Sequence, residues 1–132
     1  MTRAKDGSVG LLIDTQTLVW FSSNDKRLSN IAYDVMSNGS SKLFVSAVVA
    51  WEFSDLERRG RFPPVAKFAD IIEILSITVL DFPADAWQIL QFLPALHHDP
   101  VNRMLIAHAI HADLTLITAD AKIRGYPVKW IW

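Results

Sequence analysis

The sequence predicts an α/β protein with a central, mostly parallel sheet and helices on both faces. Short aliphatic runs recur along the chain between turn residues, as in strands that are buried on both faces. Segments with apolar residues at helical spacing separate these runs, which is typical of a parallel sheet covered by helices. The first two runs end at Asp14 and Ser46, residue types that cap a following helix well.

The elements follow in order. Predicted strands are the apolar runs at 11–13, 43–45, 77–80 and 114–118, with a final edge strand at 128–131. Predicted helices have apolar residues three or four apart or begin at capping residues, and they cover 15–22, 30–36, 46–59, 65–75, 83–93, 101–111 and 121–124. We expect a flexible leader at 1–10 and one domain over 11–132.

The composition restricts the class of protein. With 132 residues, 51% of them hydrophobic, the chain suits one domain with a substantial core. Cysteine is absent, which excludes disulfides, cysteine zinc sites and thiol nucleophiles. No apolar run approaches the ~20 residues of a membrane span, and the N-terminus lacks the apolar region of a signal peptide. We therefore expect a cytoplasmic protein without a membrane partner. Five Trp and seven Phe suggest a partner surface beyond the core.

Four acids occupy positions where chemistry is expected. Asp14 and Asp120 each follow a buried strand, and the carboxyl ends of parallel strands share one crevice. Glu52 lies on or beside an apolar helix stripe, where a carboxylate needs a partner. Asp99 precedes a proline and an apolar helix, so it lies at a helix start.

Each acid also has a purely structural interpretation. Asp14, Asp99 and Asp120 can be N-caps alone. Glu52 can form a salt bridge with Arg58 or Arg61. The shared placement of the acids favours function, since single positions do not decide it.

Carboxylates that converge repel one another unless a cation neutralises them. Oxygen ligands favour Mg²⁺ or Mn²⁺, and such ions support phosphodiester hydrolysis. A cation would also attract a polyanion to a chain of net charge −1. A zinc site built from His97, His98, His108 and His111 is disfavoured, because the H-E-x-x-H pattern is missing.

At these residues the sequence resembles the PIN-domain ribonuclease toxins of the VapC type, which belong to bacterial toxin–antitoxin systems. The resemblance runs from about Leu11 to Trp132. It rests on four segments in order, Leu11-Leu12-Ile13-Asp14-Thr15, Val45-Ser46-Ala47 through Trp51-Glu52, His97 through Ala107, and Leu116-Ile117-Thr118-Ala119-Asp120.

The resemblance implies a three-layer α/β/α sandwich and a Mg²⁺- or Mn²⁺-dependent endoribonuclease. It also implies a homodimer that a cognate antitoxin holds inactive. The implied catalytic and metal-binding residues are Asp14, Glu52, Asp99 and Asp120. The residues expected to line the site are Thr15, Ser46, Asn102 and Thr118. Candidate RNA contacts are Arg103, Lys122 and Arg124.

One position departs from the family pattern. The family usually carries an acid where this chain has Asn102, which keeps an oxygen but lacks the charge. Three explanations stay open: Asp99 substitutes, the enzyme is natively weak, or the residue was changed to abolish toxicity. The alternative function is an impaired PIN domain that binds antitoxin or RNA without efficient cleavage.

A different phosphate enzyme is a further alternative. Phosphoacceptor receivers and haloacid-dehalogenase-like phosphatases also place an acid after the first strand. The former require an upstream acidic pair, and the latter require a second Asp at the position of Gln16.

Overall fold

A five-stranded sheet forms the centre of the protein. The computed structural model describes residues 9–61 and 66–132. The strand order is β3-β2-β1-β4-β5, and every described pairing is parallel, so the predicted sheet is confirmed. The strands are β1 (Val9–Ile13), β2 (Ser41–Ser46), β3 (Thr78–Leu80), β4 (Thr115–Ile117) and β5 (Trp130–Ile131).

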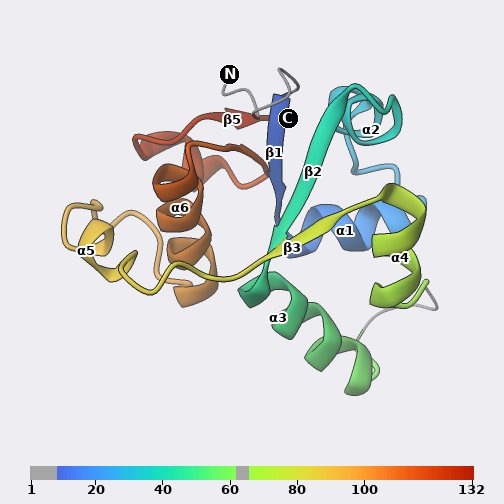
Figure 1. Cartoon of the computed structure of the whole chain (residues 1–132), viewed down its shortest axis with the longest axis horizontal. Helices are drawn as coiled ribbons and strands as arrows, with labels where there is room; N and C mark the ends of the chain where they lie inside the picture. The colour runs from blue at the N-terminus through green and yellow to red at the C-terminus, as the bar shows by residue number, and fades with distance from the viewer. Residues whose placement is uncertain (1–8, 62–65) are drawn as a thin grey trace.

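Helices cover both faces of this sheet. Figure 1 shows α5 and α6 on one side of the strands, α1, α2 and α4 on the other, and α3 beyond the end at which β2 terminates. The helices are α1 (Thr15–Ser22), α2 (Asn30–Ser37), α3 (Ala47–Arg58), α4 (Phe68–Leu75), α5 (Trp87–Leu90) and α6 (Pro100–Ala112), with a short 3-10 helix η1 (Ala121–Gly125). This arrangement confirms the predicted α/β/α layers.

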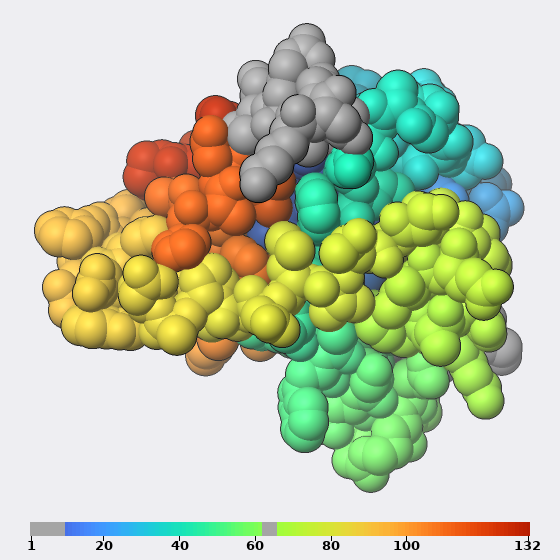
Figure 2. All heavy atoms as spheres, in the orientation of Figure 1, coloured from blue at the N-terminus to red at the C-terminus, as the bar shows by residue number. Residues whose placement is uncertain are grey.

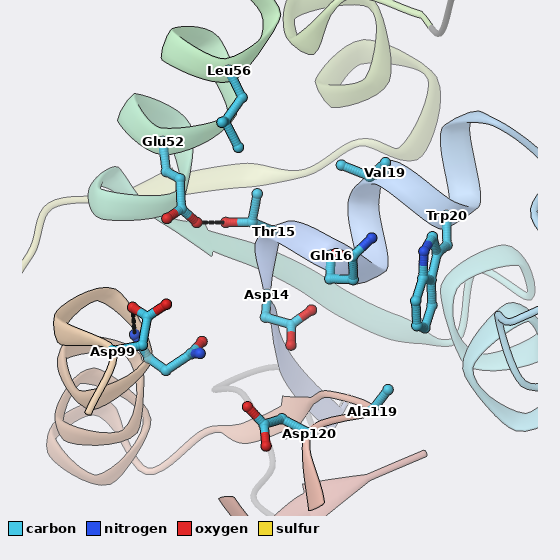
Figure 3. Close-up of a pocket in the computed structure, with 11 residues that line it drawn as sticks. Asp14, Thr15, Gln16, Val19, Trp20, Glu52, Leu56, Asp99, Ala119 and Asp120 are labelled. Atoms are coloured by element: carbon cyan, nitrogen blue, oxygen red, sulfur yellow. Dashed lines mark hydrogen bonds between the residues drawn. The ribbon is translucent and has the colours of Figure 1, made fainter. Parts of the chain in front are cut away.

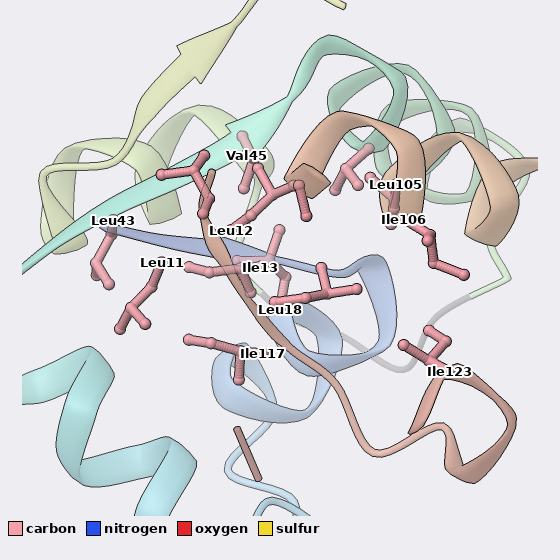
Figure 4. Close-up of a cluster of buried hydrophobic side chains, with 14 of the residues drawn as sticks. Leu11, Leu12, Ile13, Leu18, Leu43, Val45, Leu105, Ile106, Ile117 and Ile123 are labelled. Atoms are coloured by element: carbon pink, nitrogen blue, oxygen red, sulfur yellow. The ribbon is translucent and has the colours of Figure 1, made fainter. Parts of the chain in front are cut away.

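The central strand β1 is buried in the core over residues 10–13. Leu12 and Ile13 are both 0% exposed, and Figure 4 shows β1 between Leu18 of α1 and Leu105 and Ile106 of α6. Burying a side chain of this size contributes roughly 1.5–3 kcal/mol. The core thereby fixes the direction of β1 and the position of Asp14 at its end.

Strand β1 begins at Val9, two residues before the predicted start at Leu11. The sequence pattern does not predict this earlier start, because Gly10 follows Val9 and glycine is rare in strands. A Cβ at Gly10 would lie 2.7 Å from Cδ2 of Leu114, so the glycine permits close packing there.

Two predicted helices differ from the structure. The prediction of a helix over 83–93 is wrong in extent, because α5 covers only Trp87–Leu90. The flanking turns close with bonds three residues apart, such as Ala86 N to Pro83 O, and do not continue the α-helical pattern. Helix α4 begins at Phe68 and not at Val65, which lies outside the described residues.

One edge of the molecule carries exposed apolar side chains. Figure 2 shows the segment after α4 crossing the front face and the α5 region projecting at one edge. Trp87 and Phe92 of this region are 57% and 82% exposed. In residues 9–61 and 66–132, every helix is too short or too polar to cross a bilayer.

Candidate active site

A cavity of about 480 Å³ opens beside the carboxyl ends of β1 and β4. All four predicted acids line it, and they come from different elements (Figure 3). The lining consists of Asp14, Thr15, Gln16, Val19, Trp20, Glu52, Leu56, Asp99, Asn102, Ala119 and Asp120. No lysine or arginine of the described residues is among them, so the cavity gathers negative charge without a protein cation.

Three of the acids are also helix N-caps, as the structural interpretation predicted. Oδ1 of Asp14 accepts from Thr17 N at 2.8 Å. Oδ1 of Asp99 accepts from Val101 N at 2.8 Å, and Oδ1 of Asp120 accepts from Lys122 N at 2.9 Å. Because each of these bonds uses Oδ1, the caps fix the carboxylates while leaving the second oxygen for other contacts.

Asp14 is the most buried of the four acids, with 6% of its surface exposed. Burial raises the pKa of its carboxyl above the ordinary value, and the nearby negative charge of Asp120 acts in the same direction. Hydrogen bonds from Thr118 and Thr17 oppose this pKa shift without reversing it. Asp14 therefore carries a charge that costs free energy unless a positive group compensates it.

Glu52 projects from α3 toward the first residue of α1 (Figure 3). Its Oε1 accepts a hydrogen bond from Oγ1 of Thr15 at 2.5 Å. In the part of the chain that the structure describes, Glu52 forms no salt bridge with Arg58, which instead pairs with Asp55 at 3.1 Å. Thr15 thus positions the Glu52 carboxylate at the cavity.

Asp120 contacts a residue that the site prediction missed. Nε2 of His97 lies 2.6 Å from its Oδ2, and the same nitrogen lies 3.1 Å from Nδ2 of Asn102. In sequence, His97 has no distinguishing pattern beyond its place before Asp99-Pro100. Its contact with Asp120 depends on the loop conformation, which sequence spacing does not specify.

The remaining predicted site residues lie around the cavity and not in it. Thr118 is fully buried beneath the cavity. Its Oγ1 accepts from Asp120 N at 3.1 Å, and its side chain is hydrogen-bonded to Asp14, so it helps to position both acids. Ser46 is buried as the N-cap of α3. Arg103 donates to Tyr126 and to backbone carbonyls, whereas Arg124 stacks over Trp130 at 4.4 Å. Lys122 is exposed beside Asp120.

The histidines of α6 do not converge. His108 is 2% exposed and packs edge-on against Phe82, while His111 reaches outward to Asp85 at 2.9 Å. Burial lowers the pKa of His108, and the neighbouring His111 adds to this effect. His108 is thus a core residue and lies away from the acids.

The donor types in the cavity fit a divalent cation. The donors are carboxylate oxygens, and the pKa of the buried Asp14 carboxyl is raised. The lining residues supply no positive charge. Within residues 9–61 and 66–132, no three His, Asp or Glu side chains are already arranged as a metal-binding cluster. Mg²⁺ commonly binds through one or two carboxylates and retains several waters, so it does not require a closed protein cage.

Comparison with known proteins identifies the family. The PIN domain model matches residues 11–129, and the chain therefore belongs to the PIN domain family. Search of the curated proteins found no match.

Solved structures show the same fold at low identity. The VapBC2 complex of Rickettsia felis, bound to a promoter DNA fragment, has a TM-score of 0.71 and 15% identity over 93% of this chain and 98% of that one. VapC20 of Mycobacterium tuberculosis, a Sarcin-Ricin loop cleaving toxin, has a TM-score of 0.59 and 15% identity over 87% and 93%. VapBC-1 of nontypeable Haemophilus influenzae has a TM-score of 0.58 and 17% identity over 93% and 97%.

Proposed function

We propose that the chain is a metal-dependent endoribonuclease that acts as the toxin of a toxin–antitoxin pair. The observation that carries this proposal is the single cavity lined by Asp14, Glu52, Asp99 and Asp120 at the carboxyl ends of a parallel sheet. Membership of the PIN domain family supports it. The similar fold of VapC20, a Sarcin-Ricin loop cleaving toxin, supports RNA as the substrate.

In this proposal the protein side chains position a cation, and the cation compensates for their charge. Asp14 and Asp120 would hold Mg²⁺ or Mn²⁺, and Glu52 and Asp99 line the same cavity. When bound, such an ion polarises a phosphoryl oxygen and activates water. Thr15 orients Glu52, and Thr118 orients Asp14 and Asp120.

A second cavity offers a path for the RNA strand. Its volume is about 440 Å³, and it shares Gln16, Val19, Trp20 and Leu56 with the acidic cavity. Arg61 lines this second cavity, so it supplies positive charge beside the acids. A phosphate next to the scissile one would lie there.

Cleavage of a structured RNA with Mg²⁺ or Mn²⁺ tests this function. We expect wild-type chain to cut the RNA only with added cation. Asp14→Asn and Asp120→Asn should each lower the rate at least a hundredfold, because each removes a ligand charge. Lys42→Ala is the control, because Lys42 lies on β2 and lines neither of these two cavities. This variant should cleave at the wild-type rate. Cation-dependent cleavage that persists in both Asn variants would exclude this site.

Asn102 supports a second candidate, a PIN domain that binds antitoxin or RNA without efficient cleavage. Asn102 lines the acidic cavity, where it brings an amide and no charge. We expect Asn102→Asp to increase both cation affinity and cleavage. Titration calorimetry and the RNA assay measure the two effects, and an absence of gain in both would remove Asn102 from the cation's surroundings.

The proposed protein partners are a cognate antitoxin and a second copy of the chain. The similar VapBC structures support an antitoxin. An apolar cavity of about 250 Å³ between α5 and α6, with Trp87, Leu90 and Met104 in its lining, provides an exposed surface for such contacts. Light scattering after size exclusion measures the oligomeric state, and a monomer at all concentrations would contradict the homodimer.

A further inference from the structure

His97 is held against Asp120 by a hydrogen-bond pattern that specifies its proton. The Asp99 backbone N–H donates to Nδ1 of His97 at 3.1 Å, so Nδ1 is an acceptor and carries no proton. The neutral ring then carries its proton on Nε2. This N–H donates to Oδ2 of Asp120, at a nitrogen–oxygen distance of 2.6 Å.

Asn102 adjoins this arrangement. Its amide lies 3.1 Å from the same Nε2. The single proton of Nε2 is directed at Asp120, so Asn102 is a neighbour of this hydrogen bond and not its acceptor. Asn102 on α6 thus lies beside the contact between His97 and Asp120.

The loop that carries His97 is anchored from behind. The buried Tyr126 hydroxyl accepts from Leu96 N at 3.1 Å and from His97 N at 2.8 Å. Arg103 donates from Nη1 to Pro94 O at 3.1 Å and to the Tyr126 hydroxyl at 3.3 Å. These bonds fix the backbone from Pro94 to His97, so the ring meets Asp120 in a defined orientation.

We propose that His97 is a positioning residue, which holds the Asp120 carboxylate in the orientation that binds the cation. This inference rests on the proposed function of the acidic cavity. With Oδ1 held by Lys122 N and Oδ2 by His97, both Asp120 oxygens are oriented, and each keeps a lone pair for a cation. Partners of this kind around a metal ligand typically raise affinity 10–100-fold.

Calorimetric titration with MnCl₂ tests the inference without using RNA. We expect His97→Ala to weaken Mn²⁺ binding by about tenfold or more. His97→Gln should recover most of the affinity, since its side-chain amide donates from a similar position. His98→Ala is the matched control, because His98 is the adjacent exposed histidine. Circular dichroism confirms that each variant is folded.

Nitrogen NMR of the wild-type histidine rings gives a second readout. We expect His97 to show the tautomer protonated on Nε2. A His97 ring protonated on Nδ1, or a His97→Ala variant that binds Mn²⁺ as tightly as wild type or more tightly, would overturn the positioning role while leaving the proposed function intact. If the wild-type chain binds no Mn²⁺, the proposed metal-dependent function is overturned. The role of His97 in cation binding, which rests on that function, is then overturned as well.

Discussion

Tyr126 anchors the loop beside the acidic cavity, and Tyr126→Phe removes only the hydroxyl that does so. The hydroxyl accepts from Leu96 N, His97 N and Nη1 of Arg103, at 3.1, 2.8 and 3.3 Å. At about 0.5–1.5 kcal/mol for each bond, the loss is roughly 1.5–4.5 kcal/mol. Water can reach this partly buried loop and replace some of the bonds, so we expect a value near 2 kcal/mol.

Urea unfolding followed by circular dichroism measures this difference in the free energy of unfolding. For a domain of this length, a loss of about 2 kcal/mol also lowers Tm by roughly 6–10 °C. Tyr33→Phe is the matched control, because Tyr33 is 50% exposed and its described contact is a ring stack on Phe21. Equal free energies of unfolding for Tyr126→Phe and wild type would refute the anchoring of the loop.

Three further predictions concern the acids and the core histidine. Asp14→Asn should raise Tm at pH 7, because the pKa of Asp14 is raised in the folded protein and its charge is costly there. The stability that Asp14 contributes is present at low pH and is lost as pH rises through its folded pKa. The difference in Tm between Asp14→Asn and wild type should therefore vanish near pH 3. The pKa of His108 is lowered in the folded protein, so below the ordinary histidine pKa of 6.5 the unfolded chain binds this proton more readily than the folded one. The Tm of wild type should therefore fall from pH 8 to pH 5. His108→Leu should flatten this pH profile in calorimetric scans. Thr15→Val should weaken Mn²⁺ binding several-fold in calorimetry because Glu52 loses its donor, whereas Thr15→Ser should not; equal affinities in both variants would contradict the positioning of Glu52 by Thr15.

The sequence predicts the parts of this protein that depend on local patterns. Strand β1 and the Asp14 cap of α1 follow from an aliphatic run that ends in an acid, and both are present. Helix α3 ends at Arg58, one residue before the predicted end, and Gly60 follows at φ +65. Such features depend on neighbours within a few residues, which a single sequence contains.

Features that depend on turn geometry or on distant contacts are not predicted. The short α5 depends on turns that replace a helical pattern between Pro83 and Leu93. The contact of His97 with Asp120 depends on Tyr126, 29 residues later in the chain. Asp14 and Asp120 are an exception among distant pairs, because parallel strands bring their carboxyl ends together and the sequence therefore predicts that they meet.

The central claim is that these acids together hold a divalent cation. The most direct measurement is anomalous diffraction from crystals soaked in MnCl₂. We predict one strong peak in the acidic cavity, in contact with Asp14 and Asp120, that disappears in Asp14→Asn crystals. A wild-type cavity without a peak after soaking, or a peak elsewhere that Asp14→Asn leaves unchanged, would contradict the claim.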